Sequence, residues 1–174
     1  MQTGFTDISK SANLADYVPI LAAAILVDML VSTISCVYLN TENLKKWYKT
    51  YNLGAVLSDV LILLIAILIT RYIYPLVFNE WCIWKFILLA LAVQITHDFL
   101  FYGLFSAIPR GASGIMDVFK DYAGELGGMA IVGDSVLIIG TVLLASLLAG
   151  LKMEWNLFIL VVAGYLIPYF VYSF

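Results

Sequence analysis

Charged residues are scarce in this chain. Only 12% of its 174 residues are Asp, Glu, Lys or Arg, about half the share found in soluble domains. A soluble fold needs such residues to cover its surface, whereas 63% of this chain is hydrophobic. The shortage of charge excludes an ordinary soluble protein. The long apolar stretches instead identify an integral membrane protein, with the lipid bilayer as its first partner.

Basic residues are also too few for a nucleic-acid partner. The formal net charge is −3, and surfaces that bind nucleic acid need clusters of Lys and Arg. Residues 1–16 lack the basic n-region of a secretory signal peptide, and the first apolar stretch is longer than the apolar part of such a signal. We therefore expect neither nucleic-acid binding nor a cleavable signal.

Cysteine and histidine are nearly absent. The two cysteines, Cys36 and Cys82, fall on opposite sides of the expected membrane, so they cannot form a disulfide within one chain. Two lone cysteines do not make a zinc site. The single histidine, His97, stands among scattered aspartates without the ligand density of a ferritin-like site. The sequence predicts no metal and no cofactor.

Five apolar stretches are each about 20 residues long, enough to cross roughly 30 Å of hydrocarbon. They predict an all-α bundle forming one transmembrane domain over residues 1–174, with spans at 17–39, 53–74, 84–106, 127–151 and 155–174. Pro168 interrupts the last stretch, so four spans are the alternative. We expect Asp16 to cap the first helix, Pro75 to end the second, and Arg71 to extend outward to water.

A different pattern precedes the fourth span. Over residues 115–126, apolar residues recur at helical spacing, and the other face carries Asp117, Lys120, Asp121 and Glu125. This pattern predicts an amphipathic helix in the plane of the membrane interface. Its polar face is net acidic, so this face would not attract anionic lipid headgroups. Docking on another protein, or on this chain's own helices, explains that face better.

Residues 40–52 mix basic and aromatic side chains, including Lys45, Lys46 and Lys49. Such a mixture is typical of a juxtamembrane connection at headgroup level, where these lysines can meet a partner. Together with Arg110 and Lys120 they make this the more basic side of the membrane. The positive-inside rule then favours placing it in the cytosol.

Ionisable residues lie well inside four of the five apolar stretches, namely Asp28, Asp59, the pair His97 and Asp98, and Asp134. Counting depth at about 1.5 Å per residue places them in one layer about 8 Å thick, displaced toward the basic side. Gln94 shares an arc with His97 and Asp98. Each Asp facing lipid would cost about 2.5–3.5 kcal/mol, so burial against one another is the cheaper arrangement.

This buried polar layer has three interpretations. The preferred one is structural, with the side chains holding the helices together. The second is a path for protons or ions, because intramembrane carboxylates often serve one. The third is a polar binding pocket, or a site that docks a partner's membrane helix. Depth and facing do not decide among them.

No catalytic constellation stands out. Residues 111–114 (GASG) match the G-x-S-G nucleophile pattern of rhomboid proteases. Those enzymes, however, place the serine inside a bundle and the histidine on a later helix, whereas His97 precedes Ser113 here. An intramembrane enzyme would need a cavity beside His97. We therefore expect a protein that is not an enzyme.

Two segments carry a resemblance. Residues 108–111 (IPRG) followed by 116–123 (MDVFKDYA), together with 94–102 (QITHDFLFY), resemble uncharacterised multi-pass membrane proteins of large nucleocytoplasmic DNA viruses, the algal-virus and mimivirus-like groups. The resemblance covers about a fifth of the chain and brings no catalytic residue with it. It implies a place, either the internal membrane of a virion beneath a capsid or a host endomembrane during assembly.

Taken together, these features predict a structural or assembly protein of a viral membrane, a minor component that contacts capsid or scaffold proteins. A second copy of the chain is a further expected partner. The alternative is a small proton or ion channel, or a proton-coupled transporter, working through the intramembrane aspartates and His97.

Overall fold

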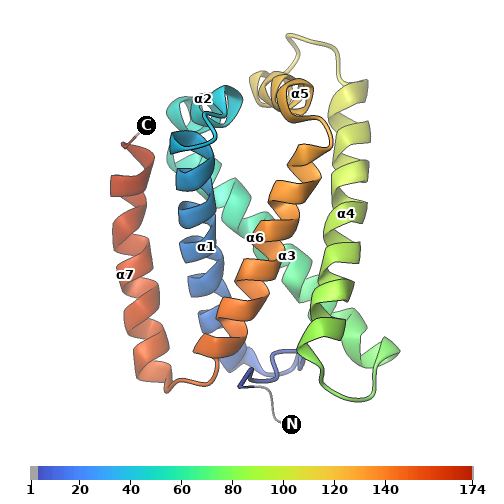
Figure 1. Cartoon of the computed structure of the whole chain (residues 1–174), viewed down its shortest axis with the longest axis vertical. Helices are drawn as coiled ribbons and strands as arrows, with labels where there is room; N and C mark the ends of the chain where they lie inside the picture. The colour runs from blue at the N-terminus through green and yellow to red at the C-terminus, as the bar shows by residue number, and fades with distance from the viewer. Residues whose placement is uncertain (1–3, 174) are drawn as a thin grey trace.

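The computed structural model describes residues 4–173, and within that range every regular element is a helix (Figure 1). A 3-10 turn at Leu14–Asp16 precedes seven α-helices: α1 (Tyr17–Val37), α2 (Glu42–Tyr51), α3 (Leu53–Val77), α4 (Ile83–Ala107), α5 (Gly114–Leu126), α6 (Met129–Leu148) and α7 (Met153–Val171). Five of them, α1, α3, α4, α6 and α7, are long and apolar enough to cross a membrane. The predicted all-α membrane bundle of five spans is confirmed.

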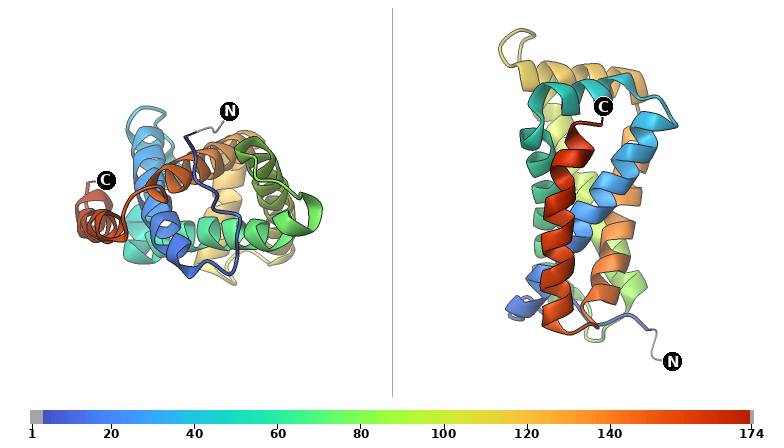
Figure 2. Two further views of the ribbon diagram at one scale, coloured as in Figure 1. Left: turned by 90° about the horizontal axis from the view of Figure 1, so that it is seen from below. Right: turned by 90° about the vertical axis from the view of Figure 1, so that its left-hand side faces the viewer.

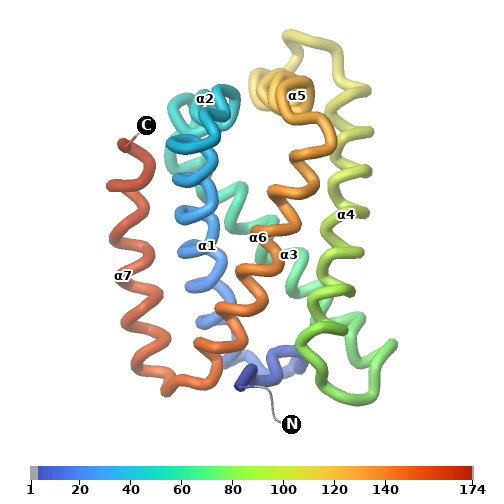
Figure 3. Tube along the Cα trace, viewed as in Figure 1, coloured from blue at the N-terminus to red at the C-terminus, as the bar shows by residue number. Residues whose placement is uncertain are grey.

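The five spans run up and down, so the two ends of the chain lie at opposite ends of the bundle (Figures 1 and 3). Helix α1 is central and packs most extensively against α6 and α7. Of the apolar window of α1, 56% is buried inside the protein, against 17% for α4. Helix α4 is therefore the span that presents most of its surface to lipid.

Close approach of α1 and α6 depends on small residues. Three consecutive alanines of α1, at positions 22–24, are fully buried. A Cβ added to Gly140 of α6 would lie 3.0 Å from a methyl group of Val27 on α1. Small residues let helix backbones approach closely, which strengthens van der Waals packing in a membrane bundle.

Helices α2 and α5 lie side by side across the end of the bundle that is remote from the N-terminus (Figures 1 and 2). The predicted amphipathic helix is confirmed as α5. It begins after Ser113, whose hydroxyl accepts the Met116 N–H, and ends at Gly127, where φ is +54°. The positive φ suits glycine and stops the helix there.

Helix α2 corrects the expectation of a loop at residues 40–52. Asn40 and Asn52 adopt positive φ values of 54° and 48°, so the chain turns sharply on both sides of the helix. The apolar side chains between them recur at helical spacing: Leu44, Trp47, Tyr48 and Tyr51. This face packs against the bundle, and Trp47 and Tyr48 are buried. Composition suggested a connection, whereas the periodicity of these four residues indicated a helix.

The two prolines do not end their helices. Helix α3 continues through Pro75 to Val77, so the predicted end at residue 74 is wrong. Helix α7 continues through Pro168 to Val171, which makes it a fifth span. A proline removes one backbone hydrogen bond, and membrane helices tolerate this when the remaining packing is intact. The last predicted residue of that span, Phe174, lies outside the described residues.

The remaining span ends shift by a few residues. The first and fourth spans end earlier than predicted, at Val37 and Leu148, and the fourth begins later, at Met129. Helix α4 extends the predicted third span by one residue at each end. Gly127 at positive φ separates α5 from α6, which explains the later start.

An N-terminal segment closes the other end of the bundle. Ile8 is fully buried there. The Thr6 N–H donates to the Ser146 carbonyl at 3.1 Å, and the Ser146 hydroxyl donates to the Thr6 carbonyl. Figure 2 shows this segment running beneath the helices. Sequence patterns did not predict this role.

Candidate functional site

The structure divides the predicted polar layer into two groups. Asp28 and Asp59 meet through side chains of α1 and α2. Gln94, His97 and Asp98 interact with one another on α4. No hydrogen bond among the described residues joins the two groups. Asp134 of α6 hydrogen-bonds to none of the described residues, although it lies near enough to Asp98 and Asp59 to feel their charges.

Asp59 is the best-satisfied carboxylate of the layer. Its Oδ2 atom accepts the Tyr48 hydroxyl at 2.8 Å and the Trp47 indole N–H at 3.1 Å. Both donors belong to α2, whereas Asp59 belongs to α3. One carboxylate oxygen therefore fixes the interfacial helix to a membrane span, and charge-assisted hydrogen bonds of this kind are stronger than neutral ones.

Tyr48 links this carboxylate to Asp28. Its single hydroxyl proton goes to Asp59, the shortest contact, so the hydroxyl accepts from Ser32, 2.9 Å away. Burial, together with the charges of Asp59 and Asp28, raises the pKa of Tyr48. The hydroxyl consequently keeps its proton at neutral pH and remains a donor.

Asp28 is poorly satisfied by comparison. It is 1% exposed, and its Oδ1 atom lies 3.5 Å from both the Ser32 and the Tyr48 hydroxyl oxygens. Its Oδ2 atom has no hydrogen-bond partner among the described residues. A buried carboxylate with so few donors is costly to keep charged, and no cation lies among its hydrogen-bond partners.

The α4 group is local to one helix. The Gln94 amide donates to Asp98 Oδ1 at 2.6 Å, one helical turn away, and the His97 ring nitrogen lies 3.4 Å from the same oxygen. The His97 ring stacks on Phe101, and its side chain is 37% exposed. These bonds stabilise the side chains of α4 but do not connect α4 to another span. Among the described residues, the hydrogen bonds of this part of the layer therefore stay within α4, and the common depth of the layer stays a prediction.

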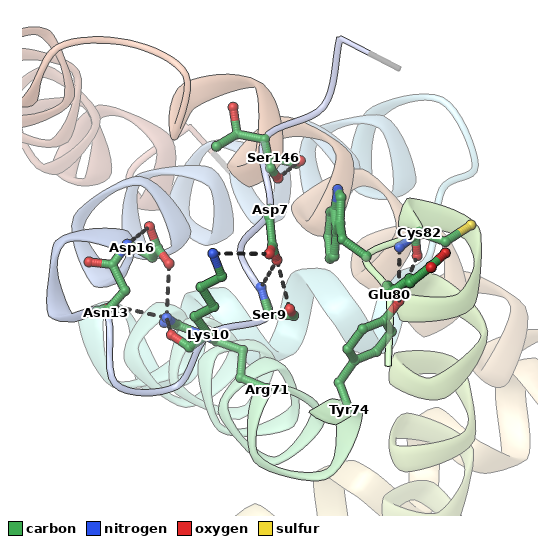
Figure 4. A network of polar contacts seen from close by, with 12 residues as sticks. Asp7, Ser9, Lys10, Asn13, Asp16, Arg71, Tyr74, Glu80, Cys82 and Ser146 are labelled. Atoms are coloured by element: carbon green, nitrogen blue, oxygen red, sulfur yellow. Dashed lines mark hydrogen bonds and ion pairs between the residues drawn. The ribbon is translucent and has the colours of Figure 1, made fainter. Parts of the chain in front are cut away.

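A second polar centre lies at the opposite end of the bundle (Figure 4). The guanidinium of Arg71, fully buried in α3, pairs with Asp16 at 3.0 Å and donates to the backbone carbonyls of Asn13 and Lys10. It also lies 5.0 Å from the centre of the Tyr17 ring. Arg71 therefore does not extend outward to water. Asp16 makes no side-chain cap on α1, because its carboxylate binds Arg71 and Asn13 instead.

The sequence contained a signal for this centre. A chain that crosses twice returns to the side it started from, so the start of the first span and the end of the second lie on the same side. Asp16 and Arg71 occupy those two positions. The prediction considered Arg71 alone, as a side chain that reaches water. It did not consider Asp16, which this topology places on the same side of the membrane.

The charged face of α5 is engaged by α2. The Glu125 carboxylate accepts the backbone N–H groups of Glu42 at 2.9 Å and Asn43 at 3.0 Å, which caps the N-terminus of α2 from another helix. Asp121 pairs with Arg110 at 2.8 Å and with Lys46 at 3.2 Å. Hydrogen bonds from these two cations lower the pKa of Asp121.

The other predicted contact residues serve nearby backbone or side chains. Asp117 accepts the Gly111 N–H at 2.8 Å, and Lys120 donates to the Ile108 carbonyl. Lys45 binds Glu42 at 3.1 Å and also the Asn40 side chain. Lys49 is exposed and forms no ion pair with the described residues. Of the two predicted explanations for the acidic face of α5, the structure shows contact with this chain's own helix.

Aromatic rings complete the attachment of the end helices. The Phe119 ring of α5 lies 5.0 Å from Trp47 of α2 and 4.9 Å from Phe101 of α4. Tyr48 meets Phe170 of α7 edge to face at 5.0 Å. We call α2, α5 and these contacts the end cap. It is held by hydrogen bonds, by ion pairs, and by aromatic rings in tilted or edge-to-face contact.

Comparison with family models, with curated proteins and with solved structures finds no match to this chain. Within the described residues, no three His, Cys, Asp or Glu side chains are grouped to hold a metal ion.

Replacing Arg71 with Gln should destabilise the bundle by about 3–5 kcal/mol, because Asp16 is left buried without its cation. Thermal unfolding in detergent micelles measures the effect. Asp16→Asn should be similarly harmful, and the double variant should lose less than the sum of the two. The matched control is Arg110→Gln, which removes an exposed arginine and should change little. An unchanged melting temperature for Arg71→Gln contradicts the assignment.

Replacing Tyr48 with Phe should destabilise the protein by about 1–3 kcal/mol, because Ser32 and Asp59 each lose a partner. Amide hydrogen exchange within α2 should accelerate at the same time, since this hydroxyl helps to fix the helix. Tyr72→Phe is the control, because Tyr72 is 69% exposed on α3. Equal exchange rates in the two variants would show that the hydroxyl does not hold α2.

Proposed function

We propose that this protein is a non-enzymatic structural or assembly component of a membrane, and that its end cap is the surface that meets other proteins. The observation that carries the proposal is the end cap itself. Two short helices lie across five spans, and their charged side chains are ordered by contacts within the chain. Such a pre-formed polar face costs little conformational entropy when a partner binds.

The buried polar groups support a structural role. Asp59, Tyr48 and Ser32 connect α3, α2 and α1, whereas Arg71 and Asp16 connect α3 to the N-terminal segment. Each centre joins different helices or segments of the chain. Side chains used in this way explain why costly polar residues lie in the membrane without invoking a substrate.

The resemblance noted in the sequence supports a location. We infer that the membrane is the internal membrane of a virion or the host endomembrane from which it forms. The resembling segments, 94–102, 108–111 and 116–123, fall on α4, the following loop and α5, around the end cap. The end cap also carries the basic side chains that favour the cytosol. A shell of cytosolic capsid or scaffold proteins would meet that face.

Amine-reactive cross-linking of intact virus particles tests this proposal. The expected links join Lys49, and Lys46 with its 53% exposed side chain, to a capsid or scaffold protein. Lys152 is the internal control, because it is exposed and immediately precedes α7, whose first turn lies at the opposite end of the bundle. Mass spectrometry identifies the linked peptides. Absence of the chain from particles, or equal linking of Lys152, contradicts the proposed role.

A proton path is the second candidate, and one specific observation favours it. Asp28 and Asp59 are joined through the hydroxyls of Ser32 and Tyr48, and Asp28 Oδ2 is buried without a hydrogen-bond partner among the described residues. A proton can pass along hydroxyls placed between two carboxyl groups. Transport would need a connection from this chain of groups to both sides of the membrane.

Reconstitution into liposomes with an enclosed pH-sensitive dye decides between the candidates. A structural protein should give no proton flux above that of protein-free liposomes. A proton path should give flux that Asp28→Asn and Asp59→Asn each abolish. Glu154→Gln, at an exposed position in the first turn of α7, removes a carboxylate outside the layer and should leave any flux intact.

A further inference from the structure

A hollow of about 360 Å³ opens between the C-terminal end of α4 and the outer side of α5. Its polar lining comes from Tyr102 and Ser106 on α4, Arg110 in the following loop, and Lys120 on α5. Phe105 adds an aromatic wall. Two cations and two hydroxyls therefore converge on one space at the level of the end cap.

The cations of this hollow keep free donors. Arg110 uses one terminal nitrogen for Asp121 and is 62% exposed, so the other N–H groups of its guanidinium face the hollow or solvent. The Lys120 ammonium donates to the Ile108 carbonyl, which is not a carboxylate, and two of its three protons remain. Asp121 is shared between Arg110 and Lys46, so it neutralises Arg110 only in part.

Two acidic residues of α5 bind backbone groups, and Asp121 is the one that binds a cation of this hollow, Arg110. Glu125 binds the backbone of α2, and Asp117 accepts the Gly111 N–H. As a whole, the polar face of α5 is acidic and gave no reason to expect an anionic ligand. The fold directs Glu125 to the backbone of α2 and brings Lys120 beside Arg110 at the hollow, where Asp121 is the one acidic residue of α5 that pairs with a lining cation. The sequence could not show this arrangement.

Below the hollow, α4 offers an apolar track. Ile95, Phe99, Tyr102 and Ser106 follow one another at spacings of four, three and four residues, so they share one face of the helix. Phe99 is 65% exposed and Ile95 is 36% exposed. A molecule with its polar part in the hollow could therefore lay an apolar chain along α4, the span with the most open surface.

We propose that this hollow binds the phosphate headgroup of an anionic phospholipid, whose acyl chains lie along the Phe99 face of α4. A phosphate accepts hydrogen bonds from guanidinium, ammonium and hydroxyl donors, and all three are present. The membrane supplies this ligand at high local concentration and in the matching orientation. The site is independent of the proposed assembly role, since it faces lipid rather than a capsid.

Native mass spectrometry of the full chain in detergent tests the site, with phosphatidylglycerol and phosphatidylcholine added in parallel. The wild-type protein should retain phosphatidylglycerol in preference. The double variant Arg110→Gln with Lys120→Gln should bind it more weakly, on the order of tenfold, because two charge-assisted contacts are lost. Lys49→Gln with Lys152→Gln removes the same net charge elsewhere and should bind as the wild type does.

Additional variants and competitors separate loss of lipid binding from loss of folding. Lys120 also binds the end of α4, so each variant's melting temperature is measured, and Arg110→Gln alone provides a milder change that should still weaken binding. Glycerol phosphate and inorganic phosphate serve as competitors, and neither should displace the lipid at millimolar concentration. Equal binding of the two lipids, equal loss in the control variant, or displacement by inorganic phosphate overturns the proposal.

Discussion

The structure depends on one constraint, which is that polar groups inside an apolar bundle must find partners within the chain. The Tyr48 hydroxyl and the Trp47 indole both donate to one oxygen of Asp59. This contact fixes the interfacial helix α2 onto α3, and α2 in turn receives the acidic face of α5 through Glu125. Without a partner for Asp59, the end cap would lose one of its polar attachments to the spans, beside its aromatic contacts with α4 and α7. The need to pair a carboxylate inside the bundle thus helps to position the helices at this end of the molecule.

The buried polar groups at the two ends of the bundle have different kinds of partner. At the end cap, carboxylates of the spans take neutral donors from α2, and the charged pairs lie outside, where water also serves them. At the N-terminal end, Arg71 is fully buried, and one terminal nitrogen of its guanidinium binds Asp16 and two backbone carbonyls, whereas Nε and Nη1 have no hydrogen-bond partner among the described residues. An ion pair shielded from water is costly to break, so this end should hold its geometry firmly. The accessible charged pairs are therefore found at the end cap, and the arginine–carboxylate pair shielded from water is found at the N-terminal end.

Part of the site was predictable, and the misses have physical causes. Depth and facing correctly suggested that Asp28 and Asp59 approach each other, because span boundaries fix how far each residue lies from the interface. They did not show that Tyr48 comes between them, since residues 40–52 were interpreted by composition rather than by their apolar period. Asp98 accepts its hydrogen bond from Gln94, one turn earlier on the same helix, and so makes none to another span among the described residues. Asp134 was expected to share the layer, and it lies near Asp98 and Asp59 but forms no hydrogen bond with the described residues.

The sequence by itself determined the class of protein, the five spans and the amphipathic helix, because hydrophobic length and helical period are local properties of the chain. Only the tertiary structure decided which polar groups meet. The pairing of Arg71 with Asp16, the capping of α2 by Glu125, and the basic hollow at Arg110 and Lys120 each join segments that no local pattern connects. Partner choice depends on distances across the bundle, and those are set when the apolar faces pack.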